Sequence, residues 1–305
     1  MTDSRWTSTD LPDLSGRTIV VTGASSGLGL ATTRALTGAG AHVVLAVRDP
    51  RKGQRVVSGI SGSTEIRQLD VADLASIHAF ADGWRGPLDV LINNAGIMAV
   101  PEGTTADGFE LQIGTNHFGP FLLTNLLLPS ISDRVVTVSS QAHRLGHLDL
   151  DDLNWRRRRY SPMRAYSDSK LANLLFTLEL QRQLTEADSP VRAIAAHPGI
   201  ARTNLLSHAG ASVAVFDRYL GWLFHDAEHG ALPIEYAATQ DIPGGSYVGP
   251  DGLGHLRGHP EIHAAANAAR DAGMARRLWA LSADLTITPA TIRAEPGIRT
   301  ERDTA

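Results

Sequence analysis

Six short runs rich in β-branched residues recur along the chain, and segments with a helical spacing of apolar residues separate them. The runs cover residues 18–21, 42–47, 65–69, 88–92, 134–138 and 191–196. One separating segment carries Leu171, Leu174, Leu175 and Leu178, which share one face of a helix. This alternation predicts an α/β fold with one doubly wound parallel sheet and helices on both faces. Such folds bind ligands at the carboxyl ends of the strands, where the strand order reverses.

The length and composition of the chain fit one such domain. Its 305 residues are 43% hydrophobic and 20% charged, which is ordinary for a protein with a sizeable core. Single cores stop growing at roughly 250 to 300 residues, so one large or two small domains are possible. The 29 glycines and 15 prolines are spread along the chain and mark no linker. We expect one domain over residues 1–288 and a loose tail over 289–305, where the periodicity weakens.

Charge and residue usage exclude several classes of protein. A formal net charge of -4 leaves no basic field for a polyanion, so we expect no nucleic-acid partner. The absence of cysteine removes disulfides, thiolate metal sites and cysteine nucleophiles, and it is compatible with a reducing compartment. The N-terminal stretch lacks the apolar segment of a secretion signal, and no run of about 18 apolar residues occurs. We therefore expect a cytoplasmic protein without a membrane span.

A glycine-rich turn follows the first predicted strand and opens a helix. Gly23 would make the tight turn, Gly27 would let the backbone approach a pyrophosphate, and Gly29 would let the helix pack closely on the strand. The helix N-terminus that follows favours anions. The turn could by itself be an ordinary strand-to-helix connection, but its context predicts a dinucleotide site. The residues of this predicted site are Gly23, Ser25, Ser26, Gly27, Leu28 and Gly29.

The second predicted strand ends in Arg48, at the position that meets the adenosine ribose in a dinucleotide fold. A basic side chain there accepts the 2′-phosphate of NADP, whereas an acidic one selects NAD. Asp49 follows, but the Asp49-Pro50 pair is typical of a helix N-cap with proline at the first helical position. We therefore predict NADP(H) rather than NAD(H). The alternative is that Arg48 is a solvated cation at a strand end.

The glycine turn, TGASSGLG, resembles the cofactor loop of the short-chain dehydrogenase/reductase family. Two further segments, each directly after a predicted strand, resemble that family's motifs. Asp70 and Val71 match the segment that contacts the adenine ring, although Asp70 could equally cap the helix beginning near Asp73. Asn93-Asn94-Ala95-Gly96 matches the NNAG motif, which supports the sheet and the floor of the cofactor site. The cofactor residues that this resemblance adds are Asp70, Val71, Asn94, Ala95 and Gly96.

Tyr166 and Lys170 open a long apolar helix four residues apart, so both lie on one helix face. A free tyrosine has a pKa near 10, too high for a base at neutral pH. We expect the lysine ammonium to lower the pKa of the Tyr166 phenol, as a nearby opposite charge does. Ser139 or Ser140, at the end of the fifth predicted strand, could donate a hydrogen bond to a substrate oxygen. Alone, the pair could also be an exposed helical pair without chemistry.

Together with Asn116, these residues resemble the catalytic tetrad of the family and follow each other along the chain in the same order. The tetrad is here Asn116, Ser140, Tyr166 and Lys170. The resemblance selects Ser140 because the family's serine matches the second of the VSS pair. It also implies that Lys170 holds the nicotinamide ribose and that Asn116 positions a water in the proton relay. The following HPGIART segment resembles the motif that contacts the nicotinamide amide. Its residues, here Pro198, Gly199, Ile200 and Thr203, complete the predicted cofactor site.

Two stretches near the predicted site point to the substrate. Twenty-five residues separate Ser140 from Tyr166, where about a dozen are usual in the family. The extra stretch, residues 143–164, resembles the branch with retinol dehydrogenases, the WW-domain oxidoreductase and protochlorophyllide reductase. Residues 202–226 are rich in apolar side chains and predict a small substrate lid, which favours a lipophilic substrate. The same stripe could be ordinary helix packing or an oligomer contact. Homo-oligomers are common in the family, and we expect one here.

Two other features carry less weight. Arg156 to Arg159 form the one dense basic run, which could bind an acidic partner, a phosphate or a lipid surface. We interpret it instead as a solvated loop whose charge is balanced by Asp149, Asp151 and Asp152. The histidines offer two candidate metal groups, at His255, His259 and His263 and at His225 and His229. Gly258 and Pro260 interrupt the helix that would align the first group, so we predict no metal site.

Together these features predict a single Rossmann-type catalytic domain. It would transfer a hydride between NADP(H) and a carbonyl or alcohol group of a lipophilic small molecule, as a carbonyl reductase or alcohol dehydrogenase. One alternative is an NADP-binding sensor or interaction protein without turnover. Another is an enzyme that reduces carbon–carbon double bonds.

Overall fold

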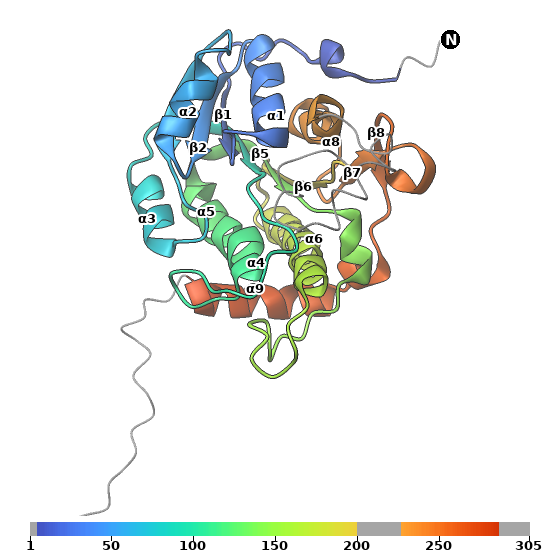
Figure 1. Ribbon diagram of the computed structural model, residues 1–305. Helices are drawn as coiled ribbons and strands as arrows, with labels where there is room; N and C mark the ends of the chain where they lie inside the picture. The colour runs from blue at the N-terminus through green and yellow to red at the C-terminus, as the bar shows by residue number, and fades with distance from the viewer. Residues whose placement is uncertain (1–4, 200–226, 287–305) are drawn as a thin grey trace, which may run out of the picture.

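A computed structural model describes residues 5–199 and 227–286 of the chain. Its centre is an eight-stranded sheet with the order β3-β2-β1-β4-β5-β6-β7-β8 (Figure 1). The strands are β1 (Thr18–Thr22), β2 (His42–Val47), β3 (Thr64–Gln68), β4 (Leu88–Asn93), β5 (Ile131–Val138), β6 (Arg192–Ala196), β7 (Tyr247–Pro250) and β8 (Pro260–His263). The order reverses between β1 and β4, and this is where a doubly wound sheet opens a crevice for a ligand.

All six predicted strands are present, and the predicted parallel sheet is confirmed for β1 to β7. The structure adds β7, which pairs with β6, and β8, which pairs antiparallel with β7. The sequence analysis did not predict these two strands. Each is only four residues long, and glycine and proline surround them, so they lack a β-branched run.

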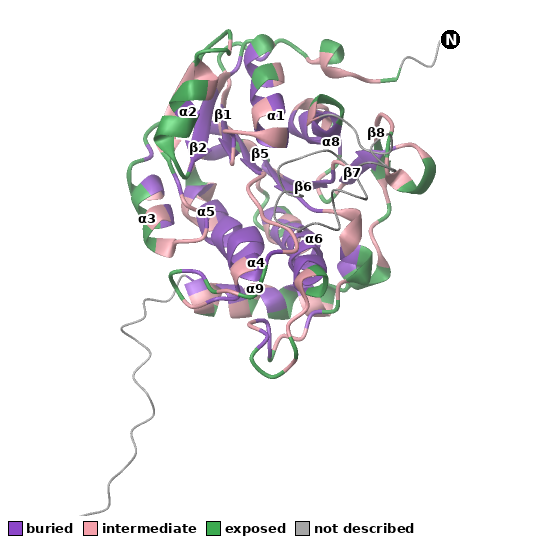
Figure 2. Ribbon diagram, in the orientation of Figure 1, coloured by how far each residue is buried: buried purple, intermediate pink, exposed green. Residues whose placement is uncertain are grey.

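Helices cover both faces of the sheet. The helices are α1 (Gly27–Gly38), α2 (Pro50–Val57), α3 (Leu74–Asp82), α4 (Leu111–Ile113), α5 (Gly119–Leu127), α6 (Pro162–Glu186), α8 (Ala227–Thr239) and α9 (Ala272–Thr286). Side chains of α1 and α8 share one apolar cluster with the sheet, whereas those of α3, α5 and α6 share another on the opposite face. Helix α9 packs against α6 on its outer side (Figure 1). The middle strands are buried from both sides (Figure 2).

Short polar residues begin two of these helices. The Asp49 side chain accepts a hydrogen bond from the Arg51 amide, and Pro50 occupies the first turn, which confirms the predicted N-cap. Helix α3 is capped by Asp73, whose carboxylate accepts from the amides of Ala75 and Ser76. Asp70 instead accepts from the Ala72 amide ahead of the helix, so the alternative role of Asp70 as its cap is wrong.

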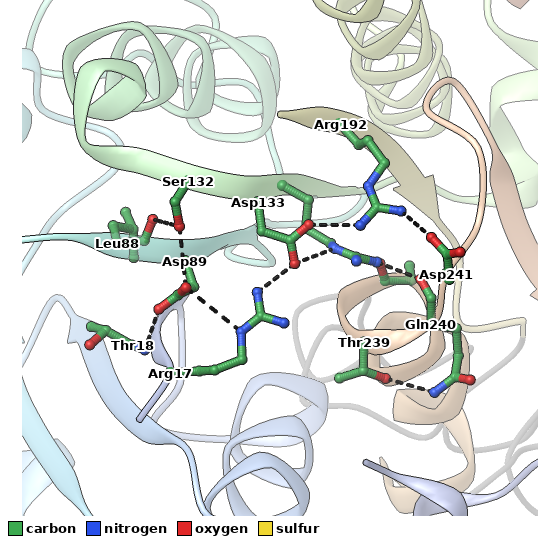
Figure 3. Close-up of polar contacts among 12 residues, drawn as sticks. Arg17, Thr18, Leu88, Asp89, Ser132, Asp133, Arg192, Thr239, Gln240 and Asp241 are labelled. Atoms are coloured by element: carbon green, nitrogen blue, oxygen red, sulfur yellow. Dashed lines mark hydrogen bonds and ion pairs between the residues drawn. The ribbon is translucent and has the colours of Figure 1, made fainter. Parts of the chain in front are cut away.

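An ion-pair network ties together the amino ends of the strands, at the edge opposite the predicted site (Figure 3). Asp133 on β5 pairs with Arg17, with Arg134 at 3.1 Å and with Arg192 at 2.8 Å. Arg192 also pairs with Asp241 at 2.8 Å. Burial favours the neutral carboxyl, but the three guanidinium groups outweigh it and lower the pKa of Asp133 to about 2. Ion pairs therefore hold the amino ends of these strands together.

The predicted lid, residues 202–226, lies outside the described residues, and so does the predicted tail, 289–305. None of the helices in the described ranges is both long and apolar enough to cross a bilayer.

Candidate functional site

The predicted site residues that the structure describes follow the carboxyl ends of β1 to β6 or lie on the helical segments beside them. These strands are neighbours in the sheet, so residues far apart in the sequence meet at one edge. The tetrad residues Ser140, Tyr166, Lys170 and Asn116 also come to this edge, from β5, α6 and the turn between α4 and α5.

The glycine turn has the shape that a phosphate-binding loop requires. Gly23 and Gly27 have φ angles of +67° and +56°, a backbone conformation that residues with a side chain adopt only with strain. A Cβ on Gly29 would lie 2.5 Å from Asn94 Nδ2, so the turn packs directly on the loop after β4. Ser26 precedes α1 without a side-chain cap, so the first amides of this 12-residue helix are left for another acceptor. A pyrophosphate fits this cradle.

The loop after β4 fastens the glycine turn to the sheet. Asn94 Nδ2 donates to the Thr22 carbonyl at 2.7 Å, and the amides of Asn94 and Ala95 donate to Thr22 Oγ1 at 3.0 and 2.9 Å. The NNAG segment thus supports β1 where it enters the turn. Its last residue, Gly96, faces the catalytic half, since a Cβ there would lie 3.0 Å from Asn116 Oδ1 and 3.5 Å from Lys170 Nζ.

The two adenosine-side predictions lie at the ends of β2 and β3. Arg48 is exposed, and within the described part of the chain it pairs with no carboxylate. Its guanidinium is therefore available to an anion. Asp70 and Val71 follow β3, and the Val71 carbonyl packs so closely on Gly119 that a Cβ there would lie 1.9 Å from its oxygen. Helix α5 holds this segment in place.

Ser140, and not Ser139, faces Tyr166. The Ser139 hydroxyl donates to the Lys170 carbonyl at 2.8 Å and is buried, so it serves the packing of α6 on β5. The Ser140 hydroxyl is hydrogen-bonded with the Tyr166 phenol, which lowers the pKa of that phenol. The geometry separates the two serines that the sequence left as alternatives.

The expectation that the pKa of Tyr166 is lowered is wrong. Tyr166 is 6% exposed, and its burial raises the pKa of the phenol more than the Ser140 hydrogen bond lowers it. Lys170 Nζ lies 5.7 Å from the centre of the tyrosine ring. The lysine is itself buried, which lowers its pKa to about 8, and its ammonium donates to the Val138 carbonyl at 3.0 Å. Desolvation dominates both groups.

Asn116 lies in a π-helical turn (Gly114–Phe118) that joins α4 to α5. Its Oδ1 accepts from the Ile97 amide at 2.8 Å, and its Nδ2 donates to the Ile97 carbonyl and to Ser169 Oγ, both at 2.9 Å. Wide turns of this kind inside helices often occur at functional sites. The asparagine thus links the loop after β4 to α6 beside Lys170.

The segment after β6 is described only in part. Gly199 has a φ angle of +69°, and a Cβ there would lie 2.3 Å from the Leu256 carbonyl oxygen, so the turn of Pro198 and Gly199 rests on the β7–β8 connection. Ile200 and Thr203, the other two predicted contacts, lie outside the described residues.

The insert between Ser140 and Tyr166 is fastened to α6 by a buried carboxylate. Asp168 accepts from the His147 amide at 2.8 Å and pairs with Arg158 at 3.2 Å, so it joins both halves of the insert. Arg158 also pairs with Asp152 and lies over the Trp155 ring. The other three arginines of the run are exposed. Within residues 5–199 and 227–286, no group of three histidine or carboxylate side chains is placed to hold a metal.

Sequence reasoning missed three buried groups beside Ser140, namely His143, His197 and Tyr247. The rings of His143 and His197 lie 5.4 and 5.0 Å from that of Tyr247. The sequence did offer one signal for these groups, because His143 lies only three residues after the predicted catalytic Ser140. His197 was read only as part of the HPG segment, and Tyr247 lies on an unpredicted strand.

Comparisons with known proteins agree with this arrangement. Residues 17–213 match the family model described as short chain dehydrogenase. Human retinol dehydrogenase 13 is 41% identical, over 92% of this chain and 88% of the relative, and mouse polyprenol dehydrogenase is 42% identical, over 90% and 85%. The crystal structure of an uncharacterised Mycobacterium paratuberculosis protein, 55% identical, superimposes with a TM-score of 0.83 and covers 93% of this chain and 98% of that one. The chain therefore belongs to the short-chain dehydrogenase/reductase family of oxidoreductases.

Proposed function

We propose that this chain reduces the carbonyl group of a lipophilic aldehyde or ketone with NADPH, or runs the reverse reaction. The observation that carries the proposal is that Ser140, Tyr166, Lys170 and Asn116 come together at the same sheet edge as the glycine turn. Retinol and polyprenol, after which the two curated relatives are named, are alcohols with long apolar chains. An apolar lid over residues 202–226 would suit such a substrate.

The residues present fit a nicotinamide dinucleotide. The glycine turn and the free amides of α1 would hold the pyrophosphate, Asp70 and Val71 the adenine, and Arg48 a 2′-phosphate. Lys170 would hold the nicotinamide ribose. Pro198 and Gly199, with Ile200 and Thr203, would contact the nicotinamide amide. When bound, this cofactor supplies or accepts the hydride.

The side chains of the site then handle the proton. Burial keeps the Tyr166 phenol protonated at neutral pH, which suits it to donate a proton to a carbonyl oxygen. The Ser140 hydroxyl would donate a hydrogen bond to the same oxygen as negative charge develops there. The Lys170 ammonium favours the phenolate that remains, and Asn116 would position a water that returns the proton.

The catalytic assignment is tested by Tyr166→Phe, with Tyr160→Phe as the matched control. Tyr166→Phe should bind NADPH with an unchanged Kd but lose at least about 100-fold in kcat on retinal-like aldehydes, the usual size of an acid–base contribution. Tyr160→Phe should keep its rate. A Tyr166→Phe enzyme near the wild-type rate would refute the mechanism. Tight NADPH binding without turnover of any carbonyl would indicate an NADP-binding sensor. Transfer of deuteride from labelled NADPH to a carbon of a C=C bond, rather than to the carbonyl carbon, would indicate an enzyme that reduces carbon–carbon double bonds.

The preference for NADP(H) rests on Arg48. Arg48→Glu should lower kcat/KM for NADPH by about tenfold or more while kcat/KM for NADH stays constant or rises, because one charge-assisted contact to phosphate is lost. Arg51→Glu, an exposed arginine on α2, is the matched control. Equal losses with both cofactors would contradict the assignment.

We extend the proposal to the setting of the enzyme. Residues 1–288 would form one catalytic domain, and the protein would work in the cytoplasm as a homo-oligomer. Limited proteolysis of the purified chain tests the single domain, and light scattering on the same sample tests the homo-oligomer. Cell fractionation tests the location in the cytoplasm.

A further inference from the structure

A buried histidine lies directly behind Ser140, and the proposed proton transfer does not use it. His143 belongs to the short helical turn Gln141–Leu145 and is 0% exposed. Its Nδ1 lies 2.7 Å from the Ser140 carbonyl oxygen, and its Nε2 lies 3.2 Å from the Ala266 amide nitrogen. The imidazole thus bridges the end of β5 and the segment that follows β8.

These two contacts determine which ring nitrogen carries the proton. A backbone carbonyl can only accept, so Nδ1 must donate to Ser140, and a backbone amide can only donate, so Nε2 must accept from Ala266. A doubly protonated ring would point an N–H at another N–H. Burial lowers the pKa of His143, and the neighbouring Arg144 lowers it further, while the Ser140 carbonyl raises it. His143 is therefore neutral, with its proton on Nδ1.

The bridge fixes the backbone from which the Ser140 hydroxyl projects. Ser140 has an extended conformation, and its carbonyl accepts from both the His143 amide, at 3.0 Å, and the His143 ring. Tyr247 packs edge-on against the ring, with its hydroxyl 3.4 Å from Nδ1. A small rotation of the Ser140 peptide would turn its hydroxyl away from Tyr166, and such misplacement is costly in catalysis.

We infer that His143 is a positioning residue, which holds Ser140 in its active orientation through the Nδ1 hydrogen bond to the Ser140 carbonyl. The inference rests on the proposed function, because it concerns the geometry of the same reaction. The alternative interpretation is that His143 has a structural role only, joining two segments of the fold. Substitutions can keep one of the two imidazole hydrogen bonds and remove the other, and this distinguishes the two interpretations.

The experiment compares His143→Asn with His143→Gln. An asparagine amide can reach the position of Nδ1 and donate to Ser140, whereas a glutamine oxygen can reach that of Nε2 and accept from Ala266. We expect His143→Asn to stay within about threefold of the wild-type kcat, and His143→Gln to lose about tenfold, which is the effect of one hydrogen bond. The NADPH Kd should not change in either variant. His259→Phe, which removes an imidazole bonded to the Trp6 carbonyl, is the matched control and should keep full activity.

Equal kcat losses in the two variants, or losses that follow their thermal stability, would overturn the inference. Retained activity in His143→Gln would do the same, while the Tyr166→Phe result would still support the proposed function. A readout independent of turnover is ¹⁵N NMR of the wild-type ring at pH 7. We expect a protonated Nδ1 and an unprotonated Nε2, and the opposite tautomer or a charged ring would refute the hydrogen-bond assignment even if no substrate is found.

Discussion

Lys170 is a buried cation, and the structure predicts what its burial costs. The side chain is 5% exposed, and its pKa falls from 10.5 to about 8 because burial disfavours the ammonium. A shift of this size corresponds to roughly 3 kcal/mol of folding free energy. Below pH 8 both the folded and unfolded chains hold the proton, and the folded state bears the full cost. Between pH 8 and 10.5 only the unfolded chain holds it, so stability rises with pH.

The perturbation that isolates this effect is Lys170→Met, which keeps the length of the side chain and removes its charge. Wild type and variant are unfolded in urea without cofactor between pH 7 and 10.5. The free energy of unfolding of the wild type, taken relative to the variant, should rise by roughly 3 kcal/mol over the upper part of this range. The Val138 carbonyl keeps a donor in the variant, since Asn173 Nδ2 lies 3.1 Å away.

The chain offers a matched control, because its only other lysine is Lys52, which is exposed on α2. Lys52→Met should show no such pH-dependent difference. NMR of ¹³C-labelled lysine side chains should also show a titration near 8, assigned to Lys170. A stability difference between wild type and Lys170→Met that stays flat between pH 8 and 10.5, or the absence of a lysine titration near 8, would refute the reasoning.

Two further predictions concern stability. Asp133→Asn should lower the free energy of unfolding by roughly 2 kcal/mol at pH 7, because its pKa of about 2 lies below the ordinary 3.8. The stabilisation is present above pH 3.8 and is lost as the pH falls towards 2, so in acid unfolding the two proteins should converge there. Gly119→Ala should lower stability by about 1 to 3 kcal/mol, since its Cβ would lie 1.9 Å from a main-chain carbonyl oxygen. Gly38→Ala, whose Cβ meets nothing within 4 Å, should not be destabilised in the same thermal melt.

Most of the sheet was predictable because each strand is a local pattern. The buried strands β1, β2, β4, β5 and β6 are short apolar runs, most of them rich in β-branched residues, and the structure begins and ends them within three residues of the prediction. The N-cap at Asp49 was predictable for the same reason, since a cap depends on its own neighbours. Strands β7 and β8 form because β7 pairs with β6 and β8 pairs with β7. Pairing between segments distant in the sequence cannot be predicted from a local pattern of residues.

The positions of the site residues were predictable, but their protonation was not. Spacing alone places Tyr166 and Lys170 on one helix face, and they do lie together. How far each is desolvated depends on the layers packed over α6, and no spacing encodes that. The predicted lowering of the pKa of Tyr166 relied on its attraction to Lys170, but the burial of the phenol raises that pKa and is the larger effect.

The hairpin of β7 and β8 explains how the missed part of the fold serves the predicted part. Gly249 on β7 packs so closely on His197 that a Cβ would lie 1.8 Å from Nε2, and the following connection touches Gly199. Tyr247, at the start of β7, packs on both His143 and His197. One short hairpin therefore supports the end of β5, through His143, and the end of β6, through His197. Because Ser140 follows β5 and β6 leads into the segment proposed to meet the nicotinamide, this hairpin packs behind both parts of the proposed site.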